Sequence, residues 1–305
     1  MAGTGWIRRR TGLRTVVAAA VAVPVLGTVR ASSRAEAPAE TPSGAGPVPP
    51  LEVMTFNLRF ASAKEPHSWA ARRPVTRALL RAAAPHVIGT QEGRSSQVRD
   101  IHADLGPHYD RIGTGRGGGD DESMTVFYDT RRLAPVEHAH FWLSDTPGVP
   151  GSNTWGAAHP RMVTWVRFRD LRADGREFCV FNTHLDNRSR YARLRSVSLI
   201  ASRLARFDPA LPMLVTGDFN AVAHRDAVHA GLLNAGLVDT WDAARLRGAA
   251  YGTYHGYRGP RPGGDRIDWI LASPFVTVHR AWVDTFSVNG QYPSDHLPVQ
   301  VSLSL

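Results

Sequence analysis

The sequence predicts an α/β fold for residues 51–305, and three observations support this prediction. From Leu51 onward, short apolar runs rich in β-branched residues alternate with amphipathic helical stretches, which is the order expected when helices cover the faces of a sheet. No internal repeat interrupts the order, and no second Pro/Gly-rich linker divides it. The composition agrees, since 43% hydrophobic and 21% charged residues exclude the disordered, collagenous and polytopic membrane classes.

Individual elements follow from the spacing of the apolar residues. Short apolar runs between turn residues predict strands over 51–58, 86–91, 124–128, 162–168, 177–184, 213–217, 267–272, 276–283 and 299–303. Apolar residues at helical spacing predict helices over 69–83, 95–105, 189–207 and 225–235. The Gly-rich tract 113–119 resembles a phosphate-binding loop, but it lacks a Lys-Ser/Thr pair and a following helix, so we expect a connector between strands.

The first 37 residues are predicted to be an export signal. Four arginines within residues 1–14 precede the apolar run 15–29, and residues 35–37 (Ala-Glu-Ala) offer a small-x-small cleavage site. The run is short and interrupted by Pro24, so it does not predict a membrane span; an uncleaved N-terminal anchor is the alternative. Residues 38–50 have the composition of a linker, and the remainder of the chain is expected to be secreted.

Much of the basic charge of the chain belongs to this predicted signal. With 36 Lys+Arg and 27 Asp+Glu, the formal charge is +9, which by itself suggests a polyanionic partner. Removal of residues 1–37 takes away six Arg and one Glu and leaves a charge of +4. The single cysteine, Cys179, excludes an internal disulfide, and the chain has no Cys-His cluster for structural zinc. The arrangement of polar residues is therefore more informative than the charge.

Polar residues follow or interrupt otherwise apolar strands in six segments. A core strand gains nothing from a carboxylate or an amide at its end, whereas a site at the rim of a sheet needs such groups. Any one segment has an ordinary explanation, such as a turn residue or a solvated acid. The six are Thr55-Phe56-Asn57-Leu58, Ile88-Gly89-Thr90-Gln91-Glu92, Phe181-Asn182-Thr183-His184-Leu185, Thr216-Gly217-Asp218-Phe219-Asn220, Arg266-Ile267-Asp268-Trp269-Ile270 and Ser294-Asp295-His296-Leu297-Pro298.

Taken in this order, the six segments resemble the endonuclease/exonuclease/phosphatase superfamily, which has the deoxyribonuclease I-like fold. The resemblance covers essentially all of 51–305, and it is most specific at 217–220 and 294–298. It implies a four-layer α/β/β/α sandwich, in which two mixed sheets pack face to face with helices outside. It also implies a metal-dependent hydrolase of phosphoric esters. Segments 141–147, 155–156 and 182–186 resemble an exported bacterial branch of metal-dependent hydrolases.

Three of these residues offer oxygen ligands for a metal ion. Glu92 and Asp295 supply carboxylate oxygens and Asn57 supplies an amide oxygen, a donor set that suits Mg²⁺ or Mn²⁺ and would hold zinc poorly. Three protein ligands do not complete an octahedron, so water and a phosphate oxygen of the substrate are expected to fill it. Such a cation would neutralise phosphate oxygens as charge develops in the transition state.

The resemblance assigns the reaction itself to four residues. It implies that Asp218 orients or deprotonates the attacking water and that Asn220 hydrogen-bonds the reacting phosphate. It places His184 and His296 on the non-bridging oxygens of the phosphate, with protonation of the leaving group as a further role for one of them.

Three further residues match supporting positions of the superfamily. Asp268 matches the acid that pairs with the C-terminal histidine and favours its cationic form. Glu122 matches the glutamate that supports the other histidine, although Asp120 and Asp121 are rival acids. Arg161 matches an arginine near the phosphate; the alternative is an arginine that only begins a strand.

The substrate is not fixed by this resemblance, since the fold hosts enzymes for nucleic acids, phospholipid headgroups, sugar phosphates and inositol phosphates. Export argues against chromosomal repair and cytosolic messenger decay, and His184 lies in a motif where abasic-site endonucleases carry Asn. No exposed apolar hairpin of the sphingomyelinase type is found. Aromatic residues in 141–147, 153–156 and 253–256 could stack on bases or sugars, or pack over the sheet edge.

From these features we expect a secreted Mg²⁺-dependent phosphoesterase that works by in-line attack of water. A phosphodiester such as nucleic acid fragments is favoured over a small phosphorylated metabolite or sugar. A sphingomyelinase-like phospholipid headgroup hydrolase and a catalytically silent binding protein of the same fold are the two less favoured functions. A silent protein would have lost a metal or histidine position, and none is lost here. We expect no protein partner and no stable membrane association after signal cleavage.

Overall fold

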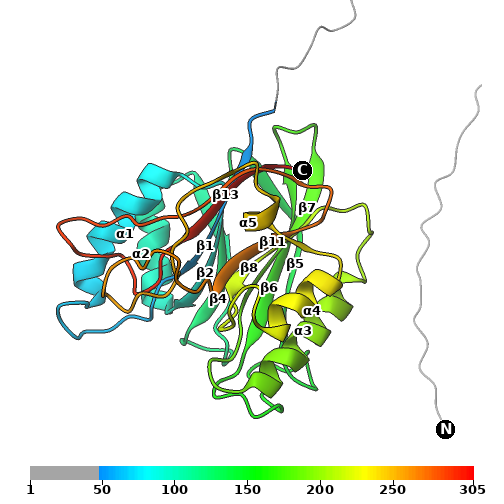
Figure 1. Ribbon diagram of the computed structural model, residues 1–305, viewed down its shortest axis with the longest axis horizontal. Helices are drawn as coiled ribbons and strands as arrows, with labels where there is room; N and C mark the ends of the chain where they lie inside the picture. The colour runs from blue at the N-terminus through cyan, green and yellow to red at the C-terminus, as the bar shows by residue number, and fades with distance from the viewer. Residues whose placement is uncertain (1–47) are drawn as a thin grey trace, which may run out of the picture. The chain divides into compact units, whose positions relative to one another are not determined.

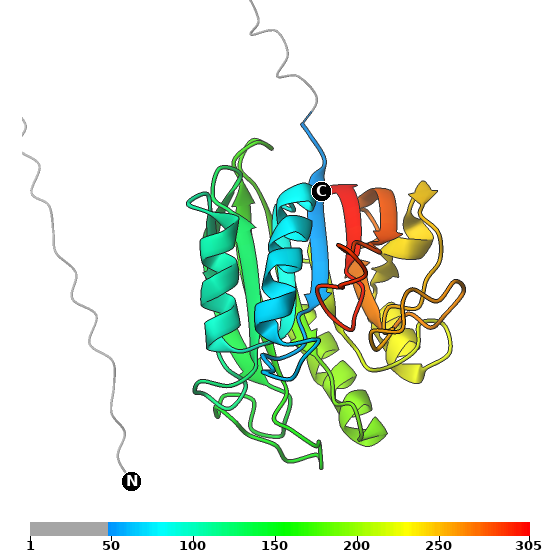
Figure 2. The same ribbon diagram turned by 90° about the vertical axis from the view of Figure 1, so that its left-hand side faces the viewer.

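The computed structural model describes residues 48–305, which form two β-sheets packed face to face with helices on both outer faces (Figure 1, Figure 2). The predicted export signal and most of the predicted linker lie outside the described residues. Within 48–305, no helix is both long enough and apolar enough to cross a bilayer. The predicted four-layer α/β/β/α sandwich of two mixed sheets is confirmed.

The first sheet has seven strands in the order β10-β12-β13-β1-β2-β4-β3. β1 is parallel to β2 and antiparallel to β13, with Leu51 opposite Leu303. Residues at the beginning of β1 and at the end of the chain therefore lie side by side, at the end of the sheet opposite to Asn57. The strands are β1 Leu51–Asn57, β2 Val87–Gly93, β3 Tyr109–Ile112, β4 Ser123–Asp129, β10 Leu246–Arg247, β12 Thr277–Val283 and β13 Val299–Ser304.

The second sheet has six strands in the order β5-β6-β7-β8-β11-β9. β7 is parallel to β8, and β8 is antiparallel to β11, so that Asp218 lies opposite both His184 and Asp268. The strands are β5 Leu133–Trp142, β6 Met162–Asp170, β7 Arg176–His184, β8 Met213–Asp218, β9 Val238–Asp239 and β11 Asp268–Ala272.

Four helices form the outer layers, two on each sheet. α1 (Trp69–Ala83) and α2 (Ser95–Leu105) cover the first sheet, and α3 (Arg190–Leu204) and α4 (Ala227–Asn234) cover the second (Figure 2). The hydroxyl group of Ser68 accepts a hydrogen bond from the backbone N–H of Ala71 and so caps the first turn of α1. A fifth, single-turn helix is α5 (Thr240–Ala243).

Strand periodicity explains how the layers are held together. Successive side chains of a strand point to opposite faces, so in β1 Val53 enters the core between the sheets while Met54 and Phe56 pack under α1 and α2. All three are at most 1% exposed. Each such buried apolar side chain contributes roughly 1.5–3 kcal/mol relative to an exposed one.

Several elements are not evident in the sequence pattern. β5 carries a proline, an acid and two histidines and is exposed over its middle residues, as an edge strand can be, so it shows no apolar run. β3 and α5 have four residues each, and β9 and β10 have two each, which is too short to show a period. The Gly-rich tract 113–119 connects β3 to β4, as predicted for a connector between strands.

Near one end of the two sheets, the layer between them changes from apolar to polar. The Gln91 side-chain amide donates to Thr55 Oγ1 at 3.1 Å and to Asn182 Oδ1 at 2.8 Å, and Thr216 Oγ1 also donates to Asn182 Oδ1. A Cβ atom on Gly89 would lie 2.2 Å from Thr216 Oγ1, so the sheets approach too closely for any side chain there. This buried network joins the two sheets directly below the residues that carry the chemistry.

Candidate active site

A cavity of about 350 Å³ opens at this polar end of the sandwich. It forms here because β1, β2, β7 and β8 all end at this edge, while antiparallel β11 and β13 begin there. The polar residues that follow or precede these strands are consequently brought together from positions far apart in the chain. The lining includes the predicted residues Glu92, Glu122, Arg161, His184, Asp218, Asn220, Asp295 and His296.

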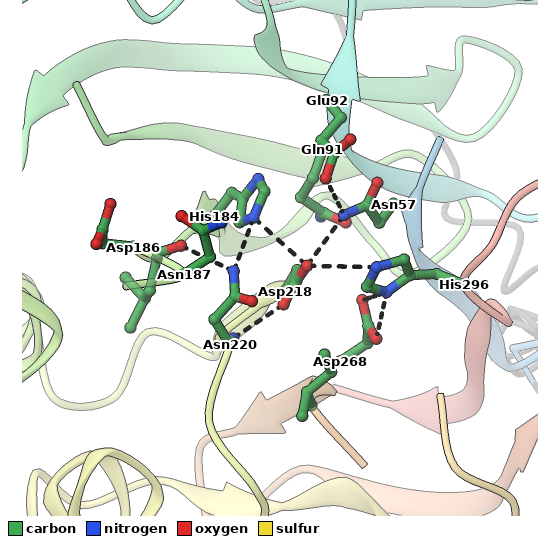
Figure 3. A network of polar contacts seen from close by, with 12 residues as sticks. Asn57, Gln91, Glu92, His184, Asp186, Asn187, Asp218, Asn220, Asp268 and His296 are labelled. Atoms are coloured by element: carbon green, nitrogen blue, oxygen red, sulfur yellow. Dashed lines mark hydrogen bonds and ion pairs between the residues drawn. The ribbon is translucent and has the colours of Figure 1, made fainter. Parts of the chain in front are cut away.

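Asp218 lies at the centre of this group (Figure 3). Its carboxylate accepts hydrogen bonds from Asn57 Nδ2 at 3.0 Å and from the backbone N–H of Asn220 at 2.9 Å. Nε2 of His184 lies 3.4 Å from Asp218 Oδ2, and Nε2 of His296 lies 3.8 Å from the same oxygen. Burial, together with the neighbouring Asp268 carboxylate, raises the pKa of Asp218 to about 7.

Asp268 and His296 form the predicted pair. Nδ1 of His296 lies 3.0 Å and 3.2 Å from the two carboxylate oxygens of Asp268, and both residues are buried. Burial opposes the charged imidazole, but the Asp268 carboxylate outweighs it and raises the pKa of His296 well above its usual value. The geometry therefore favours an imidazolium with Nε2 facing the cavity.

His184 has the opposite electrostatic character. Burial, with the positive charge of Arg161 adding to it, lowers the pKa of His184 well below the usual value. Asn220 Nδ2 lies 2.9 Å from His184 Nε2, a contact in which the amide donates to a neutral imidazole. The site therefore holds one neutral and one cationic histidine on either side of Asp218.

The predicted support of His184 by Glu122 is wrong in this structure. Glu122 lines the cavity, but its carboxylate pairs with Arg116 Nη1 at 2.7 Å. Among the described residues, His184 Nδ1 has no hydrogen-bond partner. The reason is that Arg116, in the connector between β3 and β4, brings a full charge to Glu122, which is a stronger partner than a neutral imidazole.

Arg161 contributes a buried cation to the cavity wall. It is 4% exposed, and its Nε atom lies 3.7 Å from Asp186 Oδ2. Within residues 48–305, its Nε and Nη1 atoms have no hydrogen-bond partner. Because Arg161 lines the cavity, its positive charge favours an anion at this wall.

The three predicted metal ligands, Asn57, Glu92 and Asp295, have different hydrogen-bond partners. Asn57 Nδ2 donates to Glu92 Oε1 at 2.9 Å as well as to Asp218, so Asn57 sits between two carboxylates. Asp295 lines the same cavity, but Arg59 Nη1 donates to its Oδ2 at 2.6 Å. Asn57 therefore contacts Glu92 and Asp218, whereas Asp295 is paired with Arg59 in the same cavity.

This donor set fits a hard divalent cation. Ligand atoms of Glu92, His184 and Asp218 lie within 4.8 Å of one another. Asn57 turns its amide nitrogen toward the two carboxylates and its Oδ1 toward the backbone N–H of Arg59, so its oxygen would reach a cation there only after the amide rotates and gives up that hydrogen bond. Oxygen donors of this kind suit Mg²⁺ or Mn²⁺.

Three site residues adopt a backbone conformation that L-residues rarely adopt. The φ angle is +48° at Arg59, +61° at Glu92 and +47° at Asn220. Each such residue costs on the order of 1–3 kcal/mol unless its surroundings hold it. At all three positions the backbone turns a side chain toward the cavity at the point where a strand has just ended or is ending.

The family model for the endonuclease/exonuclease/phosphatase family matches residues 54–296, a range that contains every residue lining the cavity. The chain belongs to the endonuclease/exonuclease/phosphatase family. Members of this family hydrolyse phosphoric esters and depend on a metal ion, so the prediction of a metal-dependent phosphoric ester hydrolase is confirmed. No curated protein sequence matches the chain.

Solved structures of family members are similar over almost the whole described domain. The structure of "mannosyl-6-phosphatase Bt3783" from Bacteroides thetaiotaomicron is 34% identical, with a TM-score of 0.78 over 84% of this chain and 100% of that one. An endonuclease/exonuclease/phosphatase family protein from the same species is 35% identical, with a TM-score of 0.77 over 83% and 97%. The human nocturnin catalytic domain, at 21% identity and a TM-score of 0.64 over 84% and 93%, shares the fold.

The sequence did not assign six of the cavity residues to the site, namely Arg59, Phe60, Arg116, His159, Asn187 and Ile267, whereas Tyr254 belongs to the aromatic segment 253–256 that it did indicate. Arg59 directly follows the predicted strand that contains Asn57, so its place in the chain was the one available signal. Arg116 lies in the Gly-rich connector, and His159 and Tyr254 lie in loops whose paths depend on tertiary packing. In this family member, loops therefore supply the outer wall of the site and strand ends supply its floor.

Proposed function

We propose that this protein is an exported phosphatase that removes a phosphate group from a small phosphorylated metabolite, with a sugar phosphate as the substrate class. The observation that carries the proposal is the cavity, which at about 350 Å³ suits one phosphate and a small polar group. The sequence alone favours a phosphodiester. A long nucleic acid strand is bound by an extended cationic groove, however, and the charge of +4 expected after removal of the signal gives little general attraction to one.

The aromatic loops support the same choice. Phe141, Trp142 and Trp155 are at most 7% exposed, so they pack within the protein and are not free to stack on bases. Tyr254 is 47% exposed, lines the cavity, and has its ring centre 5.0 Å from that of His296. One exposed aromatic face at the mouth of a small cavity fits one sugar ring. The 34% identical structure named as a mannosyl-6-phosphatase also supports a phosphosugar.

In the proposed reaction, Asp218 acts on the attacking water. It is buried, and its raised pKa brings it near the neutral range, which suits a group that accepts a proton at physiological pH. Asn220 is held beside it by the hydrogen bond between the Asn220 backbone N–H and Asp218 Oδ1, and its side-chain amide donates to His184 Nε2 and to the Leu185 carbonyl oxygen, which holds His184 at the cavity wall. The proton of the water passes to Asp218 as the water oxygen bonds to phosphorus and the ester P–O bond breaks, and the leaving oxygen takes a proton from His296.

The cationic groups stabilise the phosphate and its leaving group. His296, held by Asp268 with Nε2 facing the cavity, donates a hydrogen bond to an oxygen of the reacting ester. Arg161, a buried cation in the cavity wall, stabilises the negative charge that grows on the non-bridging oxygens in the transition state. A divalent cation bound by Glu92 and Asn57, which we propose to be Mg²⁺ or Mn²⁺, supplies further charge neutralisation when present.

Export is part of the proposal and rests on the N-terminal sequence. The arginine-rich start, the apolar run 15–29 and the Ala-Glu-Ala site at 35–37 support cleavage before the linker. N-terminal sequencing of the protein recovered outside the cytoplasm should begin near Pro38. Recovery of the protein only in the cytoplasm would remove export from the proposal.

The substrate class is tested by a panel with the purified protein and Mg²⁺. The panel contains mannose 6-phosphate and other sugar phosphates, nitrophenyl phosphate, bis-nitrophenyl phosphate, plasmid DNA, single-stranded oligonucleotide and sphingomyelin. We expect release of inorganic phosphate from sugar phosphates with a kcat/KM at least ~100-fold above that for the diesters, since a site shaped for one phosphosugar leaves polar groups unpaired with other esters. An Asp218→Ala preparation, purified identically, controls for contaminating phosphatases.

Each other result points to a different function. Faster cleavage of DNA or of bis-nitrophenyl phosphate would restore the diester assignment that the sequence alone favours. Cleavage of sphingomyelin alone would indicate a phospholipid headgroup hydrolase. Inertness toward every member would contradict the proposed reaction.

A further inference from the structure

Arg72, in the first turn of α1, is fully buried, and no carboxylate of residues 48–305 lies within hydrogen-bond distance of it. Its guanidinium group donates instead to five backbone carbonyl oxygens at 2.7 to 3.1 Å. The acceptors are His67, Leu58, Pro293, Arg59 and Phe60. Burial lowers the pKa of Arg72, which marks the cost of holding this cation inside the protein. A residue placed at such a cost needs an explanation beyond helix formation.

The five acceptors include residues of two segments that carry site residues. Residues 58–60 follow β1 and Asn57, and Pro293 precedes Asp295 and His296. Leu58 and Pro293 share one nitrogen of Arg72, Nη1, although they are far apart in the chain. Arg72 is therefore a physical link between the segment after the first strand and the segment before the last strand.

The opposite side of segment 58–60 contacts the proposed metal ligands. The backbone N–H of Arg59 donates to Asn57 Oδ1 at 2.9 Å, and the backbone N–H of Phe60 donates to Glu92 Oε2 at 3.2 Å. Arg72 binds the carbonyl groups of the same two residues. It thereby helps to fix the left-handed backbone at Arg59 and the positions of Asn57 and Glu92.

The second segment is tied to the first by two further contacts. Ser294 Oγ donates to the Asn57 carbonyl oxygen at 2.7 Å, and Arg59 pairs with Asp295 at 2.6 Å. The Ser294 hydroxyl also accepts from the backbone N–H of His296. Movement of Pro293 relative to Leu58 would therefore displace His296 from Asp218 and Asn57.

We propose that Arg72 is a positioning residue for hydrolysis, which holds the segment of Asn57 and the segment of His296 in a fixed mutual arrangement. It touches no substrate and acts through residues 58–60 and 293. Arginine is required because its planar group offers five donors in a fixed fork, whereas a lysine offers three from one atom. The inferred effect of Arg72 on hydrolysis rests on the proposed function, whereas its effect on the arrangement of the two segments does not.

The test compares two Arg72 variants with the same two substitutions at Arg132. Arg132 is also a buried arginine that donates to carbonyl groups, those of Pro49 and Pro50; it pairs in addition with Asp170 and lies outside the active-site cavity. We expect Arg72→Lys and Arg72→Met to lower kcat for nitrophenyl phosphate or mannose 6-phosphate about 100-fold, the size expected for displacement of reacting groups by about 1 Å. KM for the substrate should change much less. Arg132→Lys and Arg132→Met should keep kcat within about 3-fold at temperatures where they are folded, because they leave the reacting groups in place.

Two readouts do not depend on hydrolysis. Calorimetric titration with Mn²⁺ should show at least ~10-fold weaker binding to the Arg72 variants than to the Arg132 variants, the usual effect of losing a group that orients metal ligands. Hydrogen exchange should accelerate at residues 57–60 and at 294–296 together in the Arg72 variants. Wild-type kcat, Mn²⁺ affinity and exchange in Arg72→Lys would overturn the inference.

The inference can still be tested if the Arg72 variants do not fold or if the wild-type protein hydrolyses none of the substrates. If the Arg72 variants do not fold, exchange in the wild-type protein decides: the amides of Arg59, Phe60 and His296 should open with one common urea dependence, and independent opening would overturn the inference. If the wild-type protein hydrolyses no member of the panel, the proposed function fails, while Mn²⁺ binding and exchange still test the positioning by Arg72.

Discussion

Replacement of Asp268 by Asn tests the electrostatic part of the site with almost no change in shape. Asp268 and His296 are 1% and 6% exposed, and 3.0 Å separates Asp268 Oδ2 from His296 Nδ1. At an effective dielectric constant of about 20, opposite charges 3.0 Å apart attract each other by about 5.5 kcal/mol. The amide oxygen of Asn can still accept from Nδ1, so the variant removes the charge and keeps the hydrogen bond.

The expected loss of activity follows from this attraction. If about half of it acts in the transition state, the barrier rises by about 2.7 kcal/mol, which lowers kcat about 100-fold. Loss of the carboxylate also lowers the pKa of His296, which Asp268 holds above its usual value against the effect of burial. The cationic form is then lost at a lower pH, and the high-pH limit of activity should move to lower pH.

The assay is a pH–rate profile on the best substrate of the panel, measured for the wild-type protein and Asp268→Asn. Asp284→Asn makes the same acid-to-amide change outside the cavity and should keep the wild-type profile. Circular dichroism and thermal unfolding check that both variants are folded. A folded Asp268→Asn protein with wild-type kcat and an unshifted profile would refute the assigned role of the pair.

Three further predictions concern the same protein. Asp218→Ala should lower phosphoester hydrolysis by about 1000-fold, because one water-activating group contributes roughly 10²–10⁴-fold, and steady-state turnover of a folded variant near the wild-type rate would contradict this. EDTA should abolish activity and Mg²⁺ or Mn²⁺ should restore it, whereas full activity in chelator would remove Glu92 from the ligands. Burial opposes ionisation of Asp239, but hydrogen bonds from His229 and Arg266 outweigh it and lower the folded-state pKa of Asp239 to about 2. A carboxyl group with a depressed folded-state pKa stabilises the fold above pH ~4, and this stabilisation is lost as the pH falls toward ~2. Urea unfolding of Asp239→Asn should therefore show a free energy of unfolding about 2 kcal/mol lower than that of the wild type at about pH 7, and this difference should vanish near pH ~2. A difference in the free energy of unfolding that does not depend on pH would contradict the lowered pKa of Asp239.

The floor of the site could be predicted from the sequence because its residues are attached to strand ends. Asp218 and Asn220 stand two residues apart after an apolar run, and their neighbours in space follow from the pairing of β8 with β7 and β11. The helices of the outer layers were predicted for the same reason, since a period such as that of 69–83 is local information.

The walls of the site could not be predicted in this way. The Arg116–Glu122 and Arg59–Asp295 pairs depend on how loops approach, and several acids near each arginine were equally plausible partners from sequence alone. Arg72 occurs in an arginine-rich helix, and nothing local distinguishes it from the more exposed arginines beside it. Its five carbonyl partners become adjacent only when the first and last strands pair.

The pairing of Leu51 with Leu303 also determines where the enzyme can be joined to a surface or to another protein. Both chain ends of the described domain leave at one end of the central strands, and Asn57 and His296 stand at the other, about 20 Å away for a strand of this length. A surface tether, an immobilisation tag or a fused module joined at either terminus would leave the cavity mouth unobstructed. The same adjacency allows the two ends to be linked by a short loop and the chain to be reopened elsewhere, so circularly permuted forms should remain active.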